Sequence, residues 1–226
     1  MGPAATVELY ARLTAAVAAS TDQEHPRILI DSQGRVPDRT LALTAGGEDP
    51  LPYLLDSVRR LEGAGATLLV MPCNTAHAYL PALLDATDVP FVDMVGATLD
   101  ELGRRAVSSE AAGPVALLAT DGTVRVGLYQ RAADERGIPM LVPEADVQRL
   151  LMDAIGRVKA GDLDGAAAPF HAAVAQVTQA GATSVLLGCT ELSVLAVRAP
   201  ATLPAVDPLD VLVATALDRL GVARRA

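Results

Sequence analysis

The sequence contains no tryptophan, and aromatic residues make up only 3% of its 226 positions. The core must therefore be built from Ala, Val and Leu, and an apolar fraction of 51% is ample for it. No apolar run reaches the ~18 residues that a transmembrane helix needs, and the start of the chain has no signal-peptide pattern. We therefore expect a cytoplasmic protein that does not enter a membrane.

Positive charge is also scarce. The net charge is −9 and no basic patch is visible, which argues against nucleic acid and anionic membranes as partners. An anionic substrate would need a site that is made positive locally. Lys159 is the one lysine among 18 basic residues, a mild indication that an ammonium group is needed there; the alternative is a solvated helix residue.

Cysteine and histidine are rare. The two cysteines, Cys73 and Cys189, allow one disulfide at most, and in a reducing cytoplasm we expect free thiols. The three histidines lie far apart in the sequence and form no pair with the spacing of metal ligands. No glycine-rich phosphate loop is present. The sequence therefore predicts neither a metal nor a cofactor.

Both cysteines belong to an internal repeat. Residues 65–75 read GATLLVMPCNT and residues 181–191 read GATSVLLGCTE, so the cysteine stands at the same offset in each copy. A Val-Pro-Phe-Val-Asp segment follows the first copy and a Leu-Pro-Ala-Val-Asp segment follows the second. The repeat predicts two related lobes that face each other and contribute one cysteine each.

Strand and helix patterns alternate along the chain. Apolar runs bounded by turn residues predict strands near 27–30, 67–71, 91–92, 115–118, 140–142 and 184–187. Helical spacing predicts helices near 4–19, 50–63, 74–86, 96–107, 123–136, 145–159, 163–180 and 209–220, with a loop over 31–49. This order predicts an α/β fold of two pseudo-symmetric lobes, each a parallel sheet flanked by helices, with the active site in the cleft between them. The expected lobes are residues 1–93 with 208–226, and residues 94–207.

Each cysteine is expected at the end of a strand and the start of a helix, where parallel sheets bind ligands. A helix N-terminus lowers the pKa of a thiol from about 8.5 and favours the thiolate, and its free N–H groups bind carboxylates. Two thiols on opposite faces of one carbon can remove a proton from one face and return a proton to the other, which inverts the configuration. The alternatives are two inert buried cysteines or a structural disulfide.

Several segments resemble the aspartate/glutamate racemase family, the cofactor-independent two-cysteine enzymes, and most closely its aspartate racemase branch. Residues 71–77 (MPCNTAH) and 188–192 (GCTEL) are similar to the two cysteine motifs of the family. Four further segments are similar to family segments in the same order: 37–40 (PDRT), 47–50 (GEDP), 158–161 (VKAG) and 206–208 (VDP). The likeness covers essentially the whole chain.

The resemblance implies a role for each matching residue. Cys73 and Cys189 would be the two acid/base thiols, and Arg39 with Lys159 would hold the side-chain carboxylate of the substrate. A further set would bind the α-carboxylate and α-amino group together with backbone N–H groups: Met1, Asn74, Thr75, Thr120 and Thr190. Other interpretations remain open: a surface ion pair for Arg39 and ordinary N-caps for the Asn and Thr residues. His77 would either orient the site or be a structural histidine. Glu191 would either contact the ammonium group of the substrate or be a first-turn partner of the helix dipole.

Two features depart from the family pattern. The family has an apolar strand and two glycines before the segment that resembles residues 1–6. We therefore expect the first lobe to lack one parallel strand, and with it on the order of several kcal/mol of stabilisation from apolar burial. Asp121 stands where family members often have threonine. A carboxylate near an anion site would weaken binding or shift specificity.

The sequence therefore predicts a racemase that interconverts L- and D-aspartate or glutamate without pyridoxal phosphate, acting on a small acidic amino acid as a homodimer. One alternative is a dicarboxylate isomerase or decarboxylase of the same superfamily. Another is a non-catalytic binder of acidic amino acids. Aspartate and glutamate differ by one methylene group, worth only ~1–3 kcal/mol in binding, so the sequence does not separate them.

Overall fold

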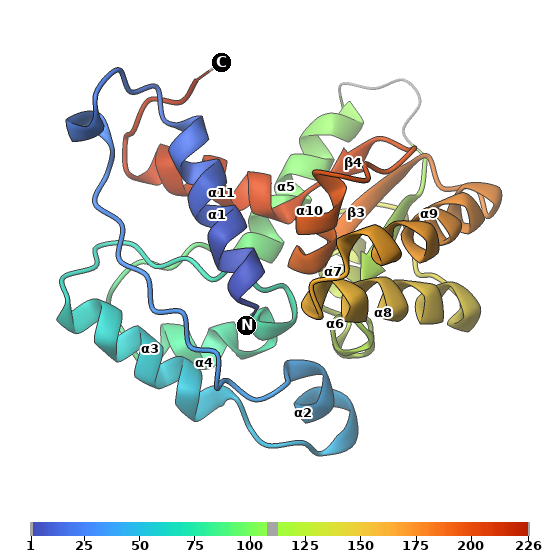
Figure 1. The fold of residues 1–226 in the computed structure, drawn as a ribbon, viewed down its shortest axis with the longest axis horizontal. Coiled ribbons are helices and arrows are strands. Elements are labelled where there is room, and N and C mark those ends of the chain that lie inside the picture. Colours follow the sequence, from blue (N-terminus) through green and yellow to red (C-terminus); the bar gives the residue numbers. More distant parts are fainter. Residues whose placement is uncertain (1, 108–112, 226) are drawn as a thin grey trace.

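A computed structural model describes residues 2–107 and 113–225. Within these residues the strands β1 (Val115–Ala119), β2 (Met140–Leu141), β3 (Ser184–Gly188) and β4 (Ala205–Val206) form one parallel sheet in the order β2-β1-β3-β4. Helices lie on both faces of this sheet (Figure 1). The predicted α/β class, with a parallel sheet flanked by helices, is therefore confirmed.

The remaining regular elements of the described residues are helical. They are α1 (Pro3–Ala16), the 3-10 helix η1 (Asp22–Glu24), α2 (Arg39–Ala45), α3 (Leu51–Gly63), the 3-10 helix η2 (Thr75–Tyr79), α4 (Leu80–Leu84), α5 (Met94–Val107), α6 (Asp121–Val126), α7 (Leu128–Asp134), α8 (Ala145–Lys159), α9 (Leu163–Gln179), α10 (Thr190–Ala196) and α11 (Pro208–Arg219). None of these helices is both long and apolar enough to cross a lipid bilayer.

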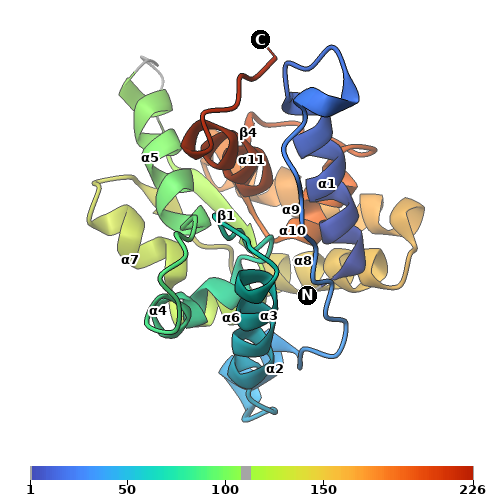
Figure 2. The same cartoon turned by 90° about the vertical axis from the view of Figure 1, so that its left-hand side faces the viewer.

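Strand β1 shows how the sheet is buried on both faces. Ala116 and Leu118 pack into a cluster with α8, α9 and α10, whereas Leu117 and Ala119 pack into a second cluster with α5 and α7. All of these side chains are fully buried, because successive residues of a strand point to opposite faces and each face is covered. Figure 2 shows β1 between α5 and α7 on one side and α8 and α9 on the other.

The N-terminal region is less regular than the sequence predicts. Neither 27–30 nor 67–71 is a sheet strand, and the pairing is reduced to one parallel bridge between Leu69 and Phe91. The Leu69 N–H donates to the Pro90 carbonyl (2.8 Å), and the Val92 N–H donates to the Leu69 carbonyl (2.9 Å). Both bonds lie on the same side of the segment, since a parallel strand directs alternate backbone groups to opposite neighbours.

The other side of that segment borders an apolar groove. Residues 28–31 and 69–72 both line it, and α1 and α3 contribute further apolar side chains. Within the described chain, no backbone hydrogen bond joins residues 26–32 to another segment. Apolar, strand-forming composition is therefore present at 27–30 and 67–71, but the pairing that makes a sheet is absent between them.

Local capping explains two smaller differences. The predicted loop over 31–49 contains α2, which begins where the Asp38 carboxylate accepts the Leu41 N–H (3.0 Å) and ends at Gly46 in the left-handed conformation (φ 66°). The predicted helix at 123–136 is interrupted at Gly127 (φ 69°), which separates α6 from α7. In both places the caps, rather than the spacing of the apolar residues, decide where the helices begin and end.

Helix α11 returns to the N-terminal region. Leu209 and Leu212 of α11 join a buried cluster with Leu9 and Leu13 of α1, and the two helices lie side by side in Figures 1 and 2. This packing is compatible with the lobe boundaries given above, which stay a prediction.

Candidate active site

The ends of the two central strands frame the candidate site. The strand order reverses between β1 and β3, and ligands of open α/β sheets bind at such a reversal, beyond the carboxyl ends of the strands. Thr120 directly follows β1 and caps α6 by accepting the Thr123 N–H (3.2 Å). Cys189 directly follows β3 and is the N-cap residue of α10.

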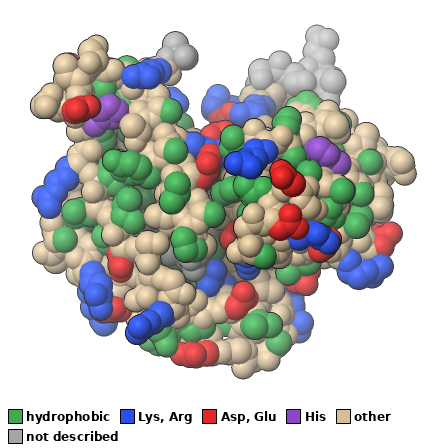
Figure 3. Space-filling view, in the orientation of Figure 1, with side chains coloured by type: hydrophobic (Ala, Val, Ile, Leu, Met, Phe, Trp, Pro, Cys, Tyr) green, Lys and Arg blue, Asp and Glu red, His purple; other side chains and the backbone are tan. Residues whose placement is uncertain are grey.

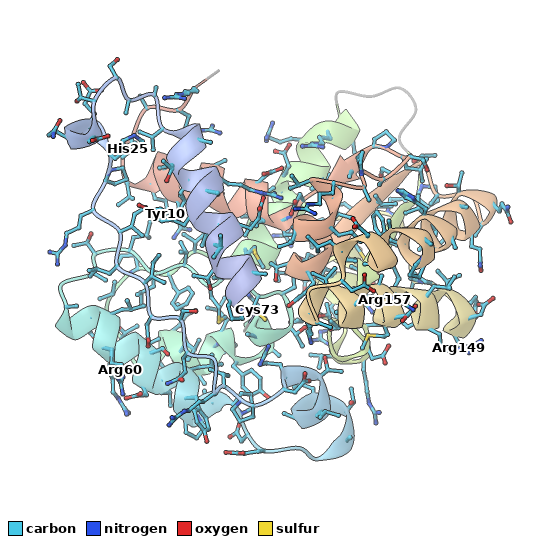
Figure 4. All side chains as sticks on the ribbon, in the orientation of Figure 1. Tyr10, His25, Arg60, Cys73, Arg149 and Arg157 are labelled. Atoms are coloured by element: carbon cyan, nitrogen blue, oxygen red, sulfur yellow. The ribbon has the colours of Figure 1, made fainter. Side chains whose placement is uncertain are left out.

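One small cavity at this point brings the predicted residues together. Eight of the nine predicted site residues line it: Arg39, Cys73, Asn74, Thr75, Thr120, Lys159, Cys189 and Thr190. The ninth, Met1, lies outside the described residues. Gly2, Asp38, Thr40 and Glu191 complete the lining. In Figure 4 the labelled Cys73 lies near the N-terminal end of α1.

The cavity is small. The space open to the centre of a water-sized sphere is about 20 Å³, little more than one water molecule requires. An amino acid would therefore enter only after side chains or whole segments around the cavity move apart. Gly2 lies close to one of the lining side chains: a Cβ atom there would lie 2.9 Å from Glu191 Oε1, so a larger residue would displace the end of the Glu191 side chain.

Cys189 is held by a buried carboxylate. Its Sγ–H donates to Glu191 Oε2 (3.0 Å), and only 4% of Cys189 and 8% of Glu191 are exposed. Burial, and next the negative charge of Glu191, raise the pKa of Cys189 well above its usual value. The sequence predicts a lowered pKa here, and that expectation is wrong for this thiol. Burial and the carboxylate outweigh the Glu191 N–H and the charge of Lys159, which act to lower the pKa.

Cys73 is positioned through its backbone by a histidine. His77 Nε2 accepts the Met94 N–H (3.2 Å), so the ring proton is on Nδ1, which donates to the Cys73 carbonyl (2.9 Å). Burial lowers the pKa of His77, which favours this neutral form. His77 does not line the cavity. Of the two interpretations of this residue, the structure therefore supports a structural histidine that fixes the Cys73 loop.

Asn74 presents an unpartnered donor. It is 2% exposed, and its Oδ1 accepts the hydroxyl proton of the fully buried Tyr129. Its Nδ2 is buried and has no hydrogen-bond partner. Tyr129 is a residue that sequence reasoning missed: it stands 55 positions from Asn74, and no local motif marks it.

Three buried threonines join the loop after Cys73 to the sheet. Thr75 Oγ1 lies 2.9 Å from the hydroxyl oxygens of both Thr120 and Thr123, which lie 3.1 Å from each other. Gly122 allows this approach, because a Cβ atom there would lie 3.0 Å from the Thr75 side chain and 3.0 Å from Thr40 Cα. Thr123 was not predicted, although its position three residues after Thr120 is typical of a capped first turn.

Two basic residues line the cavity, and both lie near Asp38. Arg39 Nη1 donates to the carbonyls of Val36 (3.1 Å) and Pro37 (2.8 Å), whereas its Nε is buried without a hydrogen-bond partner. The surface ion pair considered for Arg39 is not found among the described residues. Lys159 Nζ lies 3.6 Å from Asp38 Oδ2.

The Asp38 carboxylate lies near both basic residues. Burial acts to raise its pKa, but the Leu41 N–H and the charges of Lys159 and Arg39 outweigh that effect and lower it. Asp121, by contrast, does not line the cavity: its Oδ1 accepts a hydrogen bond from Gln148 Nε2 (2.8 Å).

The relatives of the chain include racemases. It is 23% identical over 191 residues to a broad specificity amino-acid racemase of Bacillus subtilis (strain 168), a match that spans 84% of this chain and 79% of that protein. It is 28% identical over 150 residues to a glutamate racemase of Corynebacterium kroppenstedtii, which spans 66% of this chain and 50% of that protein.

The fold agrees with these matches. An aspartate racemase of Picrophilus torridus superposes with a TM-score of 0.88 at 26% identity, covering 99% of this chain and 92% of that one. The family model described as Asp/Glu/hydantoin racemase matches residues 1–216. With nearly the whole length matched, the chain belongs to the Asp/Glu/hydantoin racemase family.

Proposed function

We propose that the chain racemises an acidic amino acid, aspartate or glutamate, by two-base proton transfer at Cα and without pyridoxal phosphate. The observation that carries the proposal is one cavity that holds both thiols of the chain together with two buried donors that lack partners, Asn74 Nδ2 and Arg39 Nε.

The unpartnered donors fit a dicarboxylate. A buried N–H group without an acceptor is costly, and a substrate carboxylate removes that cost. The guanidinium of Arg39 and the ammonium of Lys159 supply the positive charge that an acidic side chain needs in a chain of net charge −9. Asn74 Nδ2, with the backbone N–H groups that begin η2 and α10, would receive the α-carboxylate.

The state of Cys189 gives the proposed reaction a first direction. Cys189 starts protonated, donating to Glu191. The Cys73 thiolate takes the Cα proton from the face of the substrate turned toward it. The carbanion then takes a proton from the Cys189 thiol on the opposite face. The product has the inverted configuration, Cys73 now holds the proton, and Cys189 is the thiolate, ready for the reverse direction.

Proton exchange in D₂O tests this scheme. Incubation of L-aspartate, and separately L-glutamate, with the protein and no added cofactor should remove the Cα proton signal and yield the D-enantiomer on a chiral column. Cys73→Ser and Cys189→Ser should each abolish inversion. Each variant keeps one base, so each should exchange deuterium into one enantiomer with retention, and the two variants should act on opposite enantiomers.

The pattern of these variants separates the alternatives. Near wild-type racemisation by either single variant would overturn the two-base scheme. Binding of aspartate without any exchange would identify a binder, and a decarboxylated or isomerised product would identify the other enzyme classes. Assembly as a homodimer stays a prediction, which light scattering after size-exclusion chromatography tests.

A further inference from the structure

We propose that Tyr129 is a positioning residue: its hydroxyl fixes the Asn74 amide so that the NH₂ group faces the cavity and donates to the substrate carboxylate. The inference rests on the proposed function, since it assigns the carboxylate as the acceptor that Asn74 Nδ2 lacks. It adds a residue that does not itself line the cavity.

The phenol is a fixed donor. Tyr129 is fully buried on α7, in the cluster that covers one face of the sheet, so its ring is held on all sides. Burial raises the pKa of Tyr129 further above its usual value, so the hydroxyl keeps its proton near neutral pH. In the structure the Tyr129 hydroxyl donates to Asn74 Oδ1, so the amide oxygen is turned toward Tyr129 and Nδ2 lies on the other side of the amide.

The orientation of the amide matters because it carries an oxygen that accepts hydrogen bonds on one side and an NH₂ group that donates them on the other. Rotation of the Asn74 side chain by half a turn would place its oxygen toward the cavity, where it would repel a carboxylate. Within the described residues, the Tyr129 hydroxyl is the group that bonds the Asn74 side chain, and Nδ2 has no partner to hold it. Tyr129 on α7 thereby selects the donor face of a residue that follows the first cysteine.

The size of the effect follows from the bond at stake. A hydrogen bond to a charged group contributes about 1.5–3 kcal/mol, which corresponds to about 10- to 150-fold in binding. Tyr129→Phe removes the hydrogen bond that orients the Asn74 amide but leaves the amide in place. It should therefore weaken binding of an acidic amino acid by about 10-fold, near the low end of that range, and raise KM more than it lowers kcat.

The sequence offers a direct readout of the amide, because Asn74 is its one asparagine. Protein labelled with ¹⁵N-asparagine gives one side-chain NH₂ pair in a proton–nitrogen NMR spectrum. In the wild type this pair should be well dispersed and should shift on addition of L-aspartate or succinate. In Tyr129→Phe it should lose its dispersion and respond only weakly. Tyr53→Phe is the matched control, since the Tyr53 hydroxyl donates to the exposed Glu48 (2.7 Å).

A double-mutant cycle completes the test. On an Asn74→Ala background, Tyr129→Phe should have no further effect on KM, because the group that it positions is gone. An equal loss on both backgrounds, or an NH₂ pair unchanged by Tyr129→Phe, would overturn the inference. If Tyr129→Phe alters the pair but neither aspartate, glutamate nor succinate shifts it in the wild type, the proposed function fails instead.

Discussion

The hydrogen bond between Cys189 and Glu191 gives a prediction with a worked magnitude. In Glu191→Gln the amide oxygen can still accept the Sγ–H, so the substitution mainly removes one negative charge about 3.0 Å from the sulfur. At that distance the repulsion of a thiolate is ~5 kcal/mol at an effective dielectric constant of about 20 and ~1.4 kcal/mol at the dielectric constant of water. The pKa of Cys189 should therefore fall, because the thiolate no longer faces a carboxylate.

The titration needs a single thiol. Cys73→Ser leaves Cys189 as the one thiol of the chain, and the ultraviolet absorbance of the thiolate then reports its ionisation directly. Glu62→Gln, an exposed change of the same kind on α3, is the control and should leave the midpoint unchanged. A midpoint that stays constant or rises in Glu191→Gln would refute the assignment of Glu191 as the group that keeps Cys189 protonated.

Two further changes test other contacts of the site. Asp38→Asn keeps the hydrogen bond that caps Leu41 but removes the negative charge beside Lys159. This ion pair is exposed and contributes at most ~1 kcal/mol, so the affinity for L-aspartate should rise no more than about fivefold. Calorimetry should find that this gain is lost in high salt. His77 is neutral in the folded protein and has a lowered pKa, so the stability of the wild type should fall as the pH drops below about 6.5. Urea titrations of His77→Gln should show a weaker dependence of stability on pH. The same pH dependence in both proteins would contradict the assignment of a neutral histidine.

The placement of the site could be predicted because its signals are local. A cysteine at the end of an apolar strand lies at the carboxyl edge of a parallel sheet wherever the strand pairs, so the position of Cys189 follows from the pattern alone. The internal repeat pointed to Cys73 as well. The roles of Arg39, Lys159, Thr120 and the residues after Cys73 came from the family resemblance, and the structure brings all of them to the same cavity.

Contacts between distant segments could not be predicted in this way. The pKa of Cys189 depends on its burial, which cannot be inferred from the neighbouring residues in the sequence. The hydrogen bond from Tyr129 to Asn74 forms only because the packing of the fold brings two distant segments together. The segments 27–30 and 67–71 have strand-like composition, yet a strand exists only when a partner lies at bonding distance. The short helix α2 was missed because two caps define it rather than an apolar period.

The apolar groove beside residues 69–72 should make the N-terminal region aggregate more readily than the four-stranded sheet. Unpaired backbone groups on strand-like segments are templates for pairing with other chains. Here they border apolar side chains that reach solvent, among them Tyr10 (50% exposed) and Ile30 (52% exposed), and Figure 3 shows apolar side chains gathered on this face. The central strands β1 and β3 have both edges paired, so association on warming should begin at the groove and spare the sheet that carries Cys189.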